Sequence, residues 1–106
     1  MDHDEREYVA TAINYFWGDG TTTPHAVNQQ AASVLYEALQ ETQHCSASMD
    51  LVPRPVSGKP SLSSIVKQVA KVGKRIAIRD TQQYEICRLQ VARNYRTEIQ
   101  LALMGL

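Results

Sequence analysis

The residues best suited to metal binding or nucleophilic catalysis are the three histidines and two cysteines: His3, His25, His44, Cys45 and Cys87. The histidines share neither helix-face nor zinc-finger spacing with each other or with the cysteines. His44 and Cys45 are adjacent, and adjacent residues on a helix point in different directions. Cys87 falls on an apolar stripe with no histidine near it in the sequence, and a buried, unactivated thiol is inert. The sequence therefore predicts no catalytic residue, no metal site and no cofactor.

The cysteines and the first residues also bear on the cellular compartment. The acidic segment after Met1 lacks the basic stretch and apolar core of a signal peptide, so we expect a cytoplasmic protein. Free thiols suit that compartment, and a disulfide between Cys45 and Cys87 is the alternative. Uninterrupted apolar runs extend over only a few residues, which predicts no membrane span.

Charge is distributed unevenly along the chain, although the formal net charge is zero. Residues 1–50 contain eight acids and one base, a net charge of −7, whereas residues 51–106 contain ten bases and three acids, a net charge of +7. This asymmetry indicates either a charged partner or two halves that attract each other within the folded domain. The sequence leaves both alternatives open.

A basic face is predicted on the helix over residues 61–77 and directly after it. Its cations are Lys67, Lys71, Lys74, Arg75 and Arg79. A row of cations with no acid among them suits an acidic protein surface or the phosphates of a nucleic acid. The pI of about 6.8 and the few base-reading side chains at the start of this helix argue against sequence-specific readout. We expect an acidic protein partner, with nucleic acid as the alternative.

The end of the chain is predicted to lose its polar side. Past Ile99 the apolar residues point nearly all round the last helix, and such a helix must be covered by something. Arg88 lies within the apolar stripe of the same helix, where a long cation usually keeps its head in water; an ion pair across an interface is the alternative. We expect self-association or a partner helix at a surface formed by Arg88, Leu101, Leu103, Met104 and Leu106.

Trp17 is out of phase with the apolar side of the first predicted helix, which carries Tyr8, Tyr15 and Phe16. Those three aromatic residues are predicted to belong to the core. Trp17 also precedes the glycine that ends the helix, so we predict that its side chain is exposed. Because exposed tryptophans are frequent anchors at interfaces, Trp17 is a candidate partner-binding residue.

Four amphipathic helices must position these residues. They are predicted over 4–17, 24–44, 61–77 and 81–104, with a Pro-rich connecting loop over 46–60. Gly18 supplies the left-handed conformation that ends the first helix, and Thr23 followed by Pro24 is a standard helix start. Because 106 residues suit one core, residues 1–106 are predicted to form a single, small all-α domain.

Gly73 falls in the centre of the apolar face of the helix over 61–77. A glycine there costs up to about 1 kcal/mol in helix propensity. Because the apolar face continues in phase through Ile76, we predict that another helix crosses closely at Gly73. The alternative is that the helix ends at Val72 and that residues 75–78 are extended.

These features together predict a non-enzymatic protein–protein interaction module, such as a small adaptor, complex subunit or inhibitor. We expect it to act through the basic face and the apolar C-terminal helix, and to form a homo-oligomer through the latter. The alternative is a nucleic-acid-binding protein that contacts phosphates with little base-specific readout. The sequence indicates no small-molecule substrate.

Overall fold

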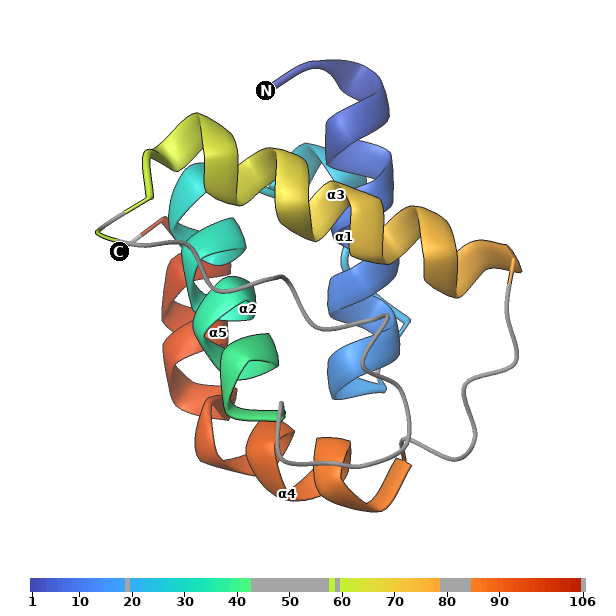
Figure 1. Ribbon diagram of the computed structural model, residues 1–106, viewed down its shortest axis with the longest axis vertical. Helices are drawn as coiled ribbons and strands as arrows, with labels where there is room; N and C mark the ends of the chain where they lie inside the picture. Colours follow the sequence, from blue (N-terminus) through green and yellow to red (C-terminus); the bar gives the residue numbers. More distant parts are fainter. Residues whose placement is uncertain (19, 43–57, 59, 79–84, 106) are drawn as a thin grey trace.

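The computed structural model describes residues 1–18, 20–42, 58, 60–78 and 85–105. Within these ranges the regular structure is helical (Figure 1). The elements are α1 (His3–Trp17), η1 (Pro24–Ala26), a 3₁₀ turn, α2 (Gln29–Glu41), α3 (Leu62–Ile78), α4 (Glu85–Asn94) and α5 (Arg96–Leu103). The predicted all-α class is confirmed. The described residues form five α-helices instead of four, and the predicted loop over 46–60 lies almost entirely outside them.

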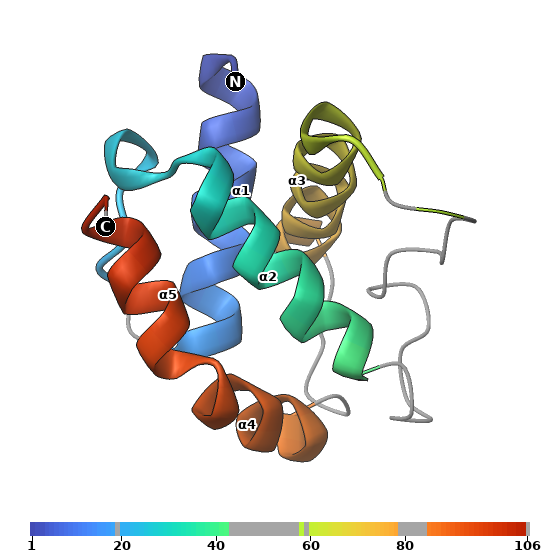
Figure 2. The same ribbon diagram turned by 90° about the vertical axis from the view of Figure 1, so that its left-hand side faces the viewer.

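The helices are arranged on two sides of a layer formed by α1 and α2 (Figures 1 and 2). On one side, α3 lies across both helices of the layer. On the opposite side, α5 packs against α2, and α4 lies across the end of the layer, where it contacts α1 and α2. The basic face of α3 and the C-terminal helix α5 therefore lie on opposite sides of the layer.

The ends of α1 follow from local signals in the sequence. Asp2 and Glu5 form a capping box, in which the Glu5 amide donates to Asp2 Oδ1 at 2.7 Å and the Asp2 amide donates to Glu5 Oε1 at 3.2 Å. Gly18 ends the helix in the left-handed region at φ 72°. The helix predicted over 4–17 is thus confirmed to within one residue.

The predicted start of the second helix at Thr23 and Pro24 is wrong. Pro24 begins only the 3₁₀ turn η1, and α2 begins at Gln29 with Asn28 as its N-cap. Asn28 Oδ1 accepts a hydrogen bond from the Ala31 amide at 2.8 Å. Between η1 and α2 the backbone is extended at Val27, whose side chain is buried in the core. Asparagine caps helices as well as threonine does, so burial of Val27 decides between the two start signals.

The close crossing predicted at Gly73 is confirmed. The helix α3 continues through Gly73 to Ile78, so the alternative that it ends at Val72 is wrong. A Cβ atom added to Gly73 would lie 2.6 Å from the carbonyl carbon of Tyr8, and closer still to its oxygen. The backbones of α1 and α3 therefore meet at a position where only glycine fits.

The helix predicted over 81–104 is wrong as a continuous helix, because the chain turns at Tyr95 between α4 and α5. The predicted apolar stripe is nevertheless buried at Val91, Ala92, Ile99 and Ala102. Its first half packs on α1 and its second half on α2. The turn at Tyr95 changes the direction of the chain, so α4 can pack on α1 and α5 can pack on α2. The predicted start at residues 81–84 lies outside the described residues.

Candidate functional site

The basic strip of α3, defined here as Lys67, Lys71, Lys74 and Arg75, is exposed along its whole length. The opposite side of α3 carries Val66, Val69 and Val72, which are buried in the core. At 1.5 Å per residue, the strip is roughly 12 Å long. Arg79, the fifth predicted cation, lies outside the described residues. The four described cations form a single exposed row on α3.

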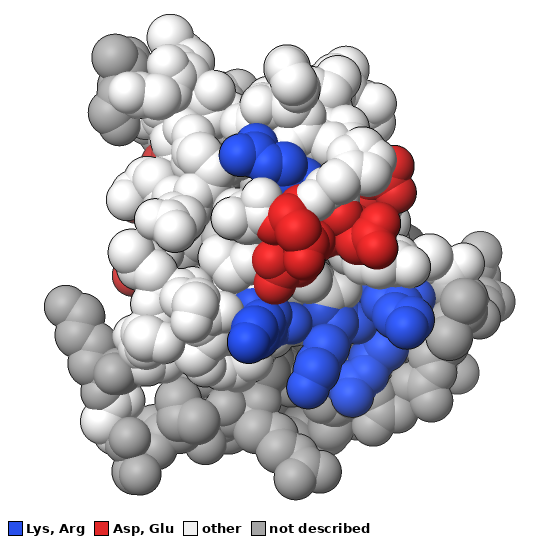
Figure 3. All heavy atoms as spheres, turned by 90° about the horizontal axis from the view of Figure 1, so that it is seen from above, with Lys and Arg blue, Asp and Glu red and all other residues white. Residues whose placement is uncertain are grey.

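An acidic patch, defined here as Asp2, Asp4, Glu5 and Glu7, lies directly beside the basic strip (Figure 3). The helix crossing explains this position. Because α1 crosses α3 at Tyr8, and Asp4 lies one helical turn before Tyr8, the first turns of α1 emerge next to α3. The sequence predicted the basic face and an excess of acids in residues 1–50, but not that some of these acids would gather beside that face.

The three lysines of the basic strip lie beside the acidic patch without forming a salt bridge to a described acid. Within the described ranges, no salt bridge joins Lys67, Lys71 or Lys74 to an acid. Three of the four acids have partners at the start of α1: Glu7 Oε1 lies 3.1 Å from His3 Nε2, and the side chains of Asp2 and Glu5 each accept a hydrogen bond from the other's backbone amide. Direct ion pairing with the described acids therefore does not occupy the lysines of the strip.

The surface predicted around the C-terminal helix is only partly present. Leu101 and Met104 are 44% and 70% exposed, whereas Leu103 is half-buried against the core. Leu106 lies outside the described residues. Apolar residues were expected nearly all round this helix, in need of a cover. The helix α2 covers one side of α5. A smaller apolar surface formed by Leu101 and Met104 remains.

Arg88 is not part of a partner surface, and the expectation that its head stays in water is wrong. Its side chain is 4% exposed. Its Nη1 atom donates to the carbonyl oxygens of Tyr15 and Phe16, at 2.8 and 2.6 Å. These carbonyls belong to the last turn of α1, where helical partners are missing and a cation is favourable. The guanidinium also lies 5.0 Å from the centre of the Tyr15 ring. Arg88 therefore caps α1 from α4.

Trp17 is also not an exposed anchor, contrary to the prediction. Its side chain is only 8% exposed, and its indole Nε1 donates to the carbonyl oxygen of Ala92 at 2.8 Å. The ring of Phe16 packs edge-on against it, with 4.8 Å between ring centres. The prediction assumed that only one side of α1 is buried. In the structure, α3 and α4 cover α1 from two directions. Trp17 faces α4.

The burial of Trp17 predicts its fluorescence, which it alone supplies because it is the single tryptophan. We expect emission at a shorter wavelength than in the urea-unfolded chain, and several-fold weaker quenching by acrylamide, because the indole is shielded from water. Trp17→Phe is expected to lower the free energy of unfolding by about 1 kcal/mol through loss of the hydrogen bond to Ala92. Emission and quenching that do not change on unfolding would show that Trp17 is exposed.

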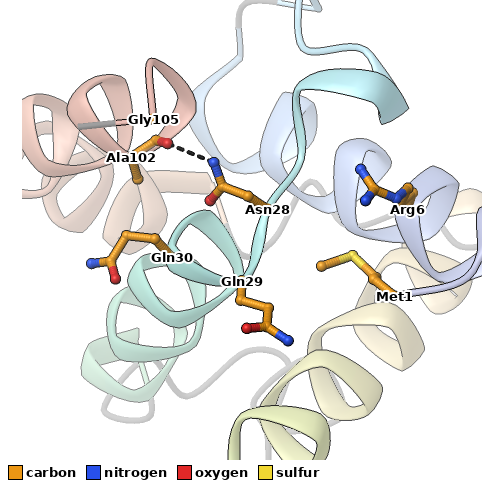
Figure 4. Close-up of a pocket in the computed structure, with 7 residues that line it drawn as sticks. All are labelled: Met1, Arg6, Asn28, Gln29, Gln30, Ala102 and Gly105. Atoms are coloured by element: carbon orange, nitrogen blue, oxygen red, sulfur yellow. Dashed lines mark hydrogen bonds between the residues drawn. The ribbon is translucent and has the colours of Figure 1, made fainter.

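An open pocket of about 510 Å³ lies between the start of α2 and the end of α5 (Figure 4). Its lining consists of Met1, Arg6, Asn28, Gln29, Gln30, Ala102 and Gly105. Asn28 Nδ2 donates to the carbonyl oxygen of Ala102 at 2.8 Å, and Arg6 Nη1 donates to that of Val27 at 2.9 Å. This lining contains amides and one guanidinium but no carboxylate, thiol or imidazole.

A second pocket is lined by two of the three histidines that were considered as metal ligands in the sequence. His3 and His25 line it with Arg6. The permanent positive charge of the Arg6 guanidinium opposes a metal cation at this position. His44 and Cys45 lie outside the described residues, and Cys87 is placed only by its backbone in α4. No group of three or more histidine, cysteine, aspartate or glutamate side chains capable of holding a metal ion occurs among the described residues.

Tyr95 joins the turn between α4 and α5 to the end of α2. Its hydroxyl donates to Glu41 Oε1 at 2.6 Å. This hydrogen bond, reinforced by burial and by the negative charges of Glu41, Glu37 and Glu98, holds the pKa of the Tyr95 hydroxyl well above its ordinary range. The hydroxyl therefore stays protonated and keeps donating at neutral pH.

Comparison of the chain with protein-family models, curated proteins and solved structures found no match. Among the helices that the structure describes, none is long and apolar enough to cross a membrane. The surfaces themselves are therefore the basis for assigning a function.

Proposed function

We propose that this protein is a non-enzymatic protein–protein interaction module that binds an acidic protein surface through the basic strip of α3. The observation that carries the proposal is the strip itself, because its four cations are exposed in one line. The lysines Lys67, Lys71 and Lys74 have no salt bridge to a described acid. Complementary charge on a partner would steer its approach and fix its orientation.

The neighbouring acidic patch favours a protein partner over a nucleic acid. Phosphate groups continue along a nucleic acid, so a strand that follows the strip runs alongside the acidic patch, which repels it. A protein surface can present acids opposite the strip and bases or neutral groups opposite the patch. The zero net charge of the chain adds no general attraction for polyanions.

The apolar surface of Leu101 and Met104 is a second contact surface in this proposal, for a partner helix or for self-association. It lies on the opposite side of the α1–α2 layer from the basic strip. The two surfaces therefore serve separate contacts, which suits an adaptor or a subunit of a complex. Substituting one surface is expected to leave contacts at the other intact.

Fluorescence anisotropy with two labelled probes, an oligoglutamate peptide and a mixed-sequence DNA duplex, tests the basic strip. The variant carries Lys67→Glu, Lys71→Glu and Lys74→Glu; the matched control reverses Arg93 and Arg96, which are exposed cations outside the strip. At low salt we expect the wild type and the control to bind the peptide, and the strip variant to bind at least about tenfold more weakly. Circular dichroism checks that all three chains are folded.

Two outcomes would contradict the proposal. Equal peptide binding by the strip variant and the wild type would show that the strip is not the docking surface. Tighter binding of the wild type to the duplex than to the peptide, lost in the strip variant and weakened steeply by salt, would favour the nucleic-acid alternative.

A further inference from the structure

We propose that the acidic patch of a second copy of this chain docks on the basic strip, so that the protein forms a symmetric homodimer through its charged face. This inference rests on the proposed function of the strip and names one partner for it. The face carries both halves of a complementary pair, since the acidic patch and the basic strip lie side by side and look outward in the same direction (Figure 3).

The geometry of the face permits a closed two-fold arrangement. If a two-fold axis runs along the boundary between patch and strip, in the plane of the interface, rotation places each acidic patch opposite the partner's basic strip. Both patch–strip contacts then form in the same dimer, and neither copy has an unpaired patch or strip left to bind a third copy. Such a self-complementary contact is the commonest type of oligomer interface.

The two groups contain equal numbers of opposite charges. The strip contributes four cations, and the patch contributes four acids, of which Asp2, Asp4 and Glu7 are exposed and Glu5 is half-buried. Since the chain carries no formal net charge, two copies have no net repulsion to overcome as they approach. Within one copy, neither Asp4 nor the three lysines of the strip form a salt bridge with a described residue; pairing between copies supplies these partners.

The contact is expected to be weak and sensitive to salt. Exposed ion pairs each contribute little, because water and salt screen them. The Debye length falls from about 30 Å at 0.01 M salt to about 3 Å at 1 M. The apolar surface of Leu101 and Met104 belongs to the end of the chain around α5, a helix that lies on the opposite side of the α1–α2 layer from α3, and the proposed dimer contact does not include it.

Charge exchange between two variants tests the dimer by sedimentation equilibrium. The basic-reversed variant carries Lys67→Glu, Lys71→Glu and Lys74→Glu. The acid-reversed variant carries Asp4→Lys and Glu7→Lys, which leaves the capping box of Asp2 intact. The matched control reverses Arg93 and Arg96. Each chain is measured alone, and the two reversed variants are also measured as an equimolar mixture.

At about 0.01 M salt we expect the wild type and the control to dimerise with a dissociation constant below about 1 mM, and about 1 M salt to dissociate the dimer. Each reversed variant alone is expected to associate at least about tenfold more weakly than the wild type, and the mixture to regain association as a heterodimer. Recovery in the mixture also shows that both variants are folded.

A wild type that stays monomeric at low salt overturns the dimer. Self-association that survives both charge reversals, or that is lost instead in Leu101→Glu/Met104→Glu, also overturns it and assigns the contact to another surface. If the wild type is monomeric but still binds the oligoglutamate peptide through the strip, the dimer fails and the proposed function stands. If it is monomeric and does not bind the peptide, both fail.

Discussion

Gly73→Ala is expected to lower the free energy of unfolding by about 2–4 kcal/mol. In an ordinary helix interior the same change raises helix stability by up to about 1 kcal/mol. Here the added methyl group would overlap the carbonyl group of Tyr8, so α1 and α3 must separate. Inserting a methyl group into a packed contact typically costs about 1–3 kcal/mol, and more where the obstacle is backbone that cannot rotate away. The steric cost therefore exceeds the gain in helix propensity.

Urea unfolding followed by circular dichroism measures this effect. Lys71→Ala is the matched control, because Lys71 lies on the exposed side of the same helix and its substitution should stay within about 0.5 kcal/mol of the wild type. A Gly73→Ala variant as stable as the wild type, or more stable, would show that α1 does not cross α3 at this residue.

Arg88→Met is the second substitution with a large expected effect, a loss of about 3 kcal/mol. It leaves the carbonyl oxygens of Tyr15 and Phe16 without the donor that now reaches both. Each buried polar group left unsatisfied costs about 1–3 kcal/mol, and loss of a cation at the end of α1 adds up to about 2 kcal/mol. Removing a buried charge returns part of its desolvation cost. The unsatisfied carbonyls outweigh that gain because they belong to the backbone and remain in place.

The control for Arg88 is Arg93→Met, because Arg93 lies on the same helix but is exposed. Its substitution is expected to change the unfolding free energy by less than about 0.5 kcal/mol. The unfolding free energy of Arg88→Lys should lie between those of Arg88→Met and Arg93→Met. An ammonium group keeps the charge but lacks the planar fork that reaches two carbonyls. If Arg88→Met unfolds at the same urea concentration as Arg93→Met, the guanidinium does not cap α1.

The parts of this fold that the sequence predicted rest on local signals. The left-handed Gly18 and the phase of the apolar face around Gly73 each involve residues within a few positions of one another. The start of α2 was missed because two good start signals, Thr23 and Asn28, lie close together. Burial of Val27, a tertiary effect, selects the second.

The roles of Arg88 and Trp17 were missed for a different reason. Their hydrogen-bond acceptors are backbone carbonyls more than seventy positions away in the sequence. Every residue carries such a carbonyl, so no residue type marks the acceptor. A cation in an apolar stripe signals an unusual environment, but only the packing of α4 on the end of α1 shows that this environment is a helix terminus.

The candidate surface shows the same division. Helix phase alone placed Lys67, Lys71 and Lys74 on one exposed side of α3, and that prediction depends only on spacing. The acidic patch lies beside them because α1 crosses α3 at Tyr8, and the sequence does not determine the direction in which one helix crosses another. In the folded protein, acids of the negative half and cations of the positive half thus lie next to each other on one face.

The measurement that tests the central claim most directly is residue-by-residue mapping of acidic-peptide binding by NMR. Oligoglutamate peptide is added to isotope-labelled protein at a concentration where the chain is monomeric, and backbone amide shifts are followed. We predict that the shifts concentrate on the exposed side of α3 around Lys67, Lys71 and Lys74, and that α4 and α5 change little. Shifts that centre on Arg93 and Arg96, or that spread evenly over every exposed cation, would contradict the basic strip as the docking surface.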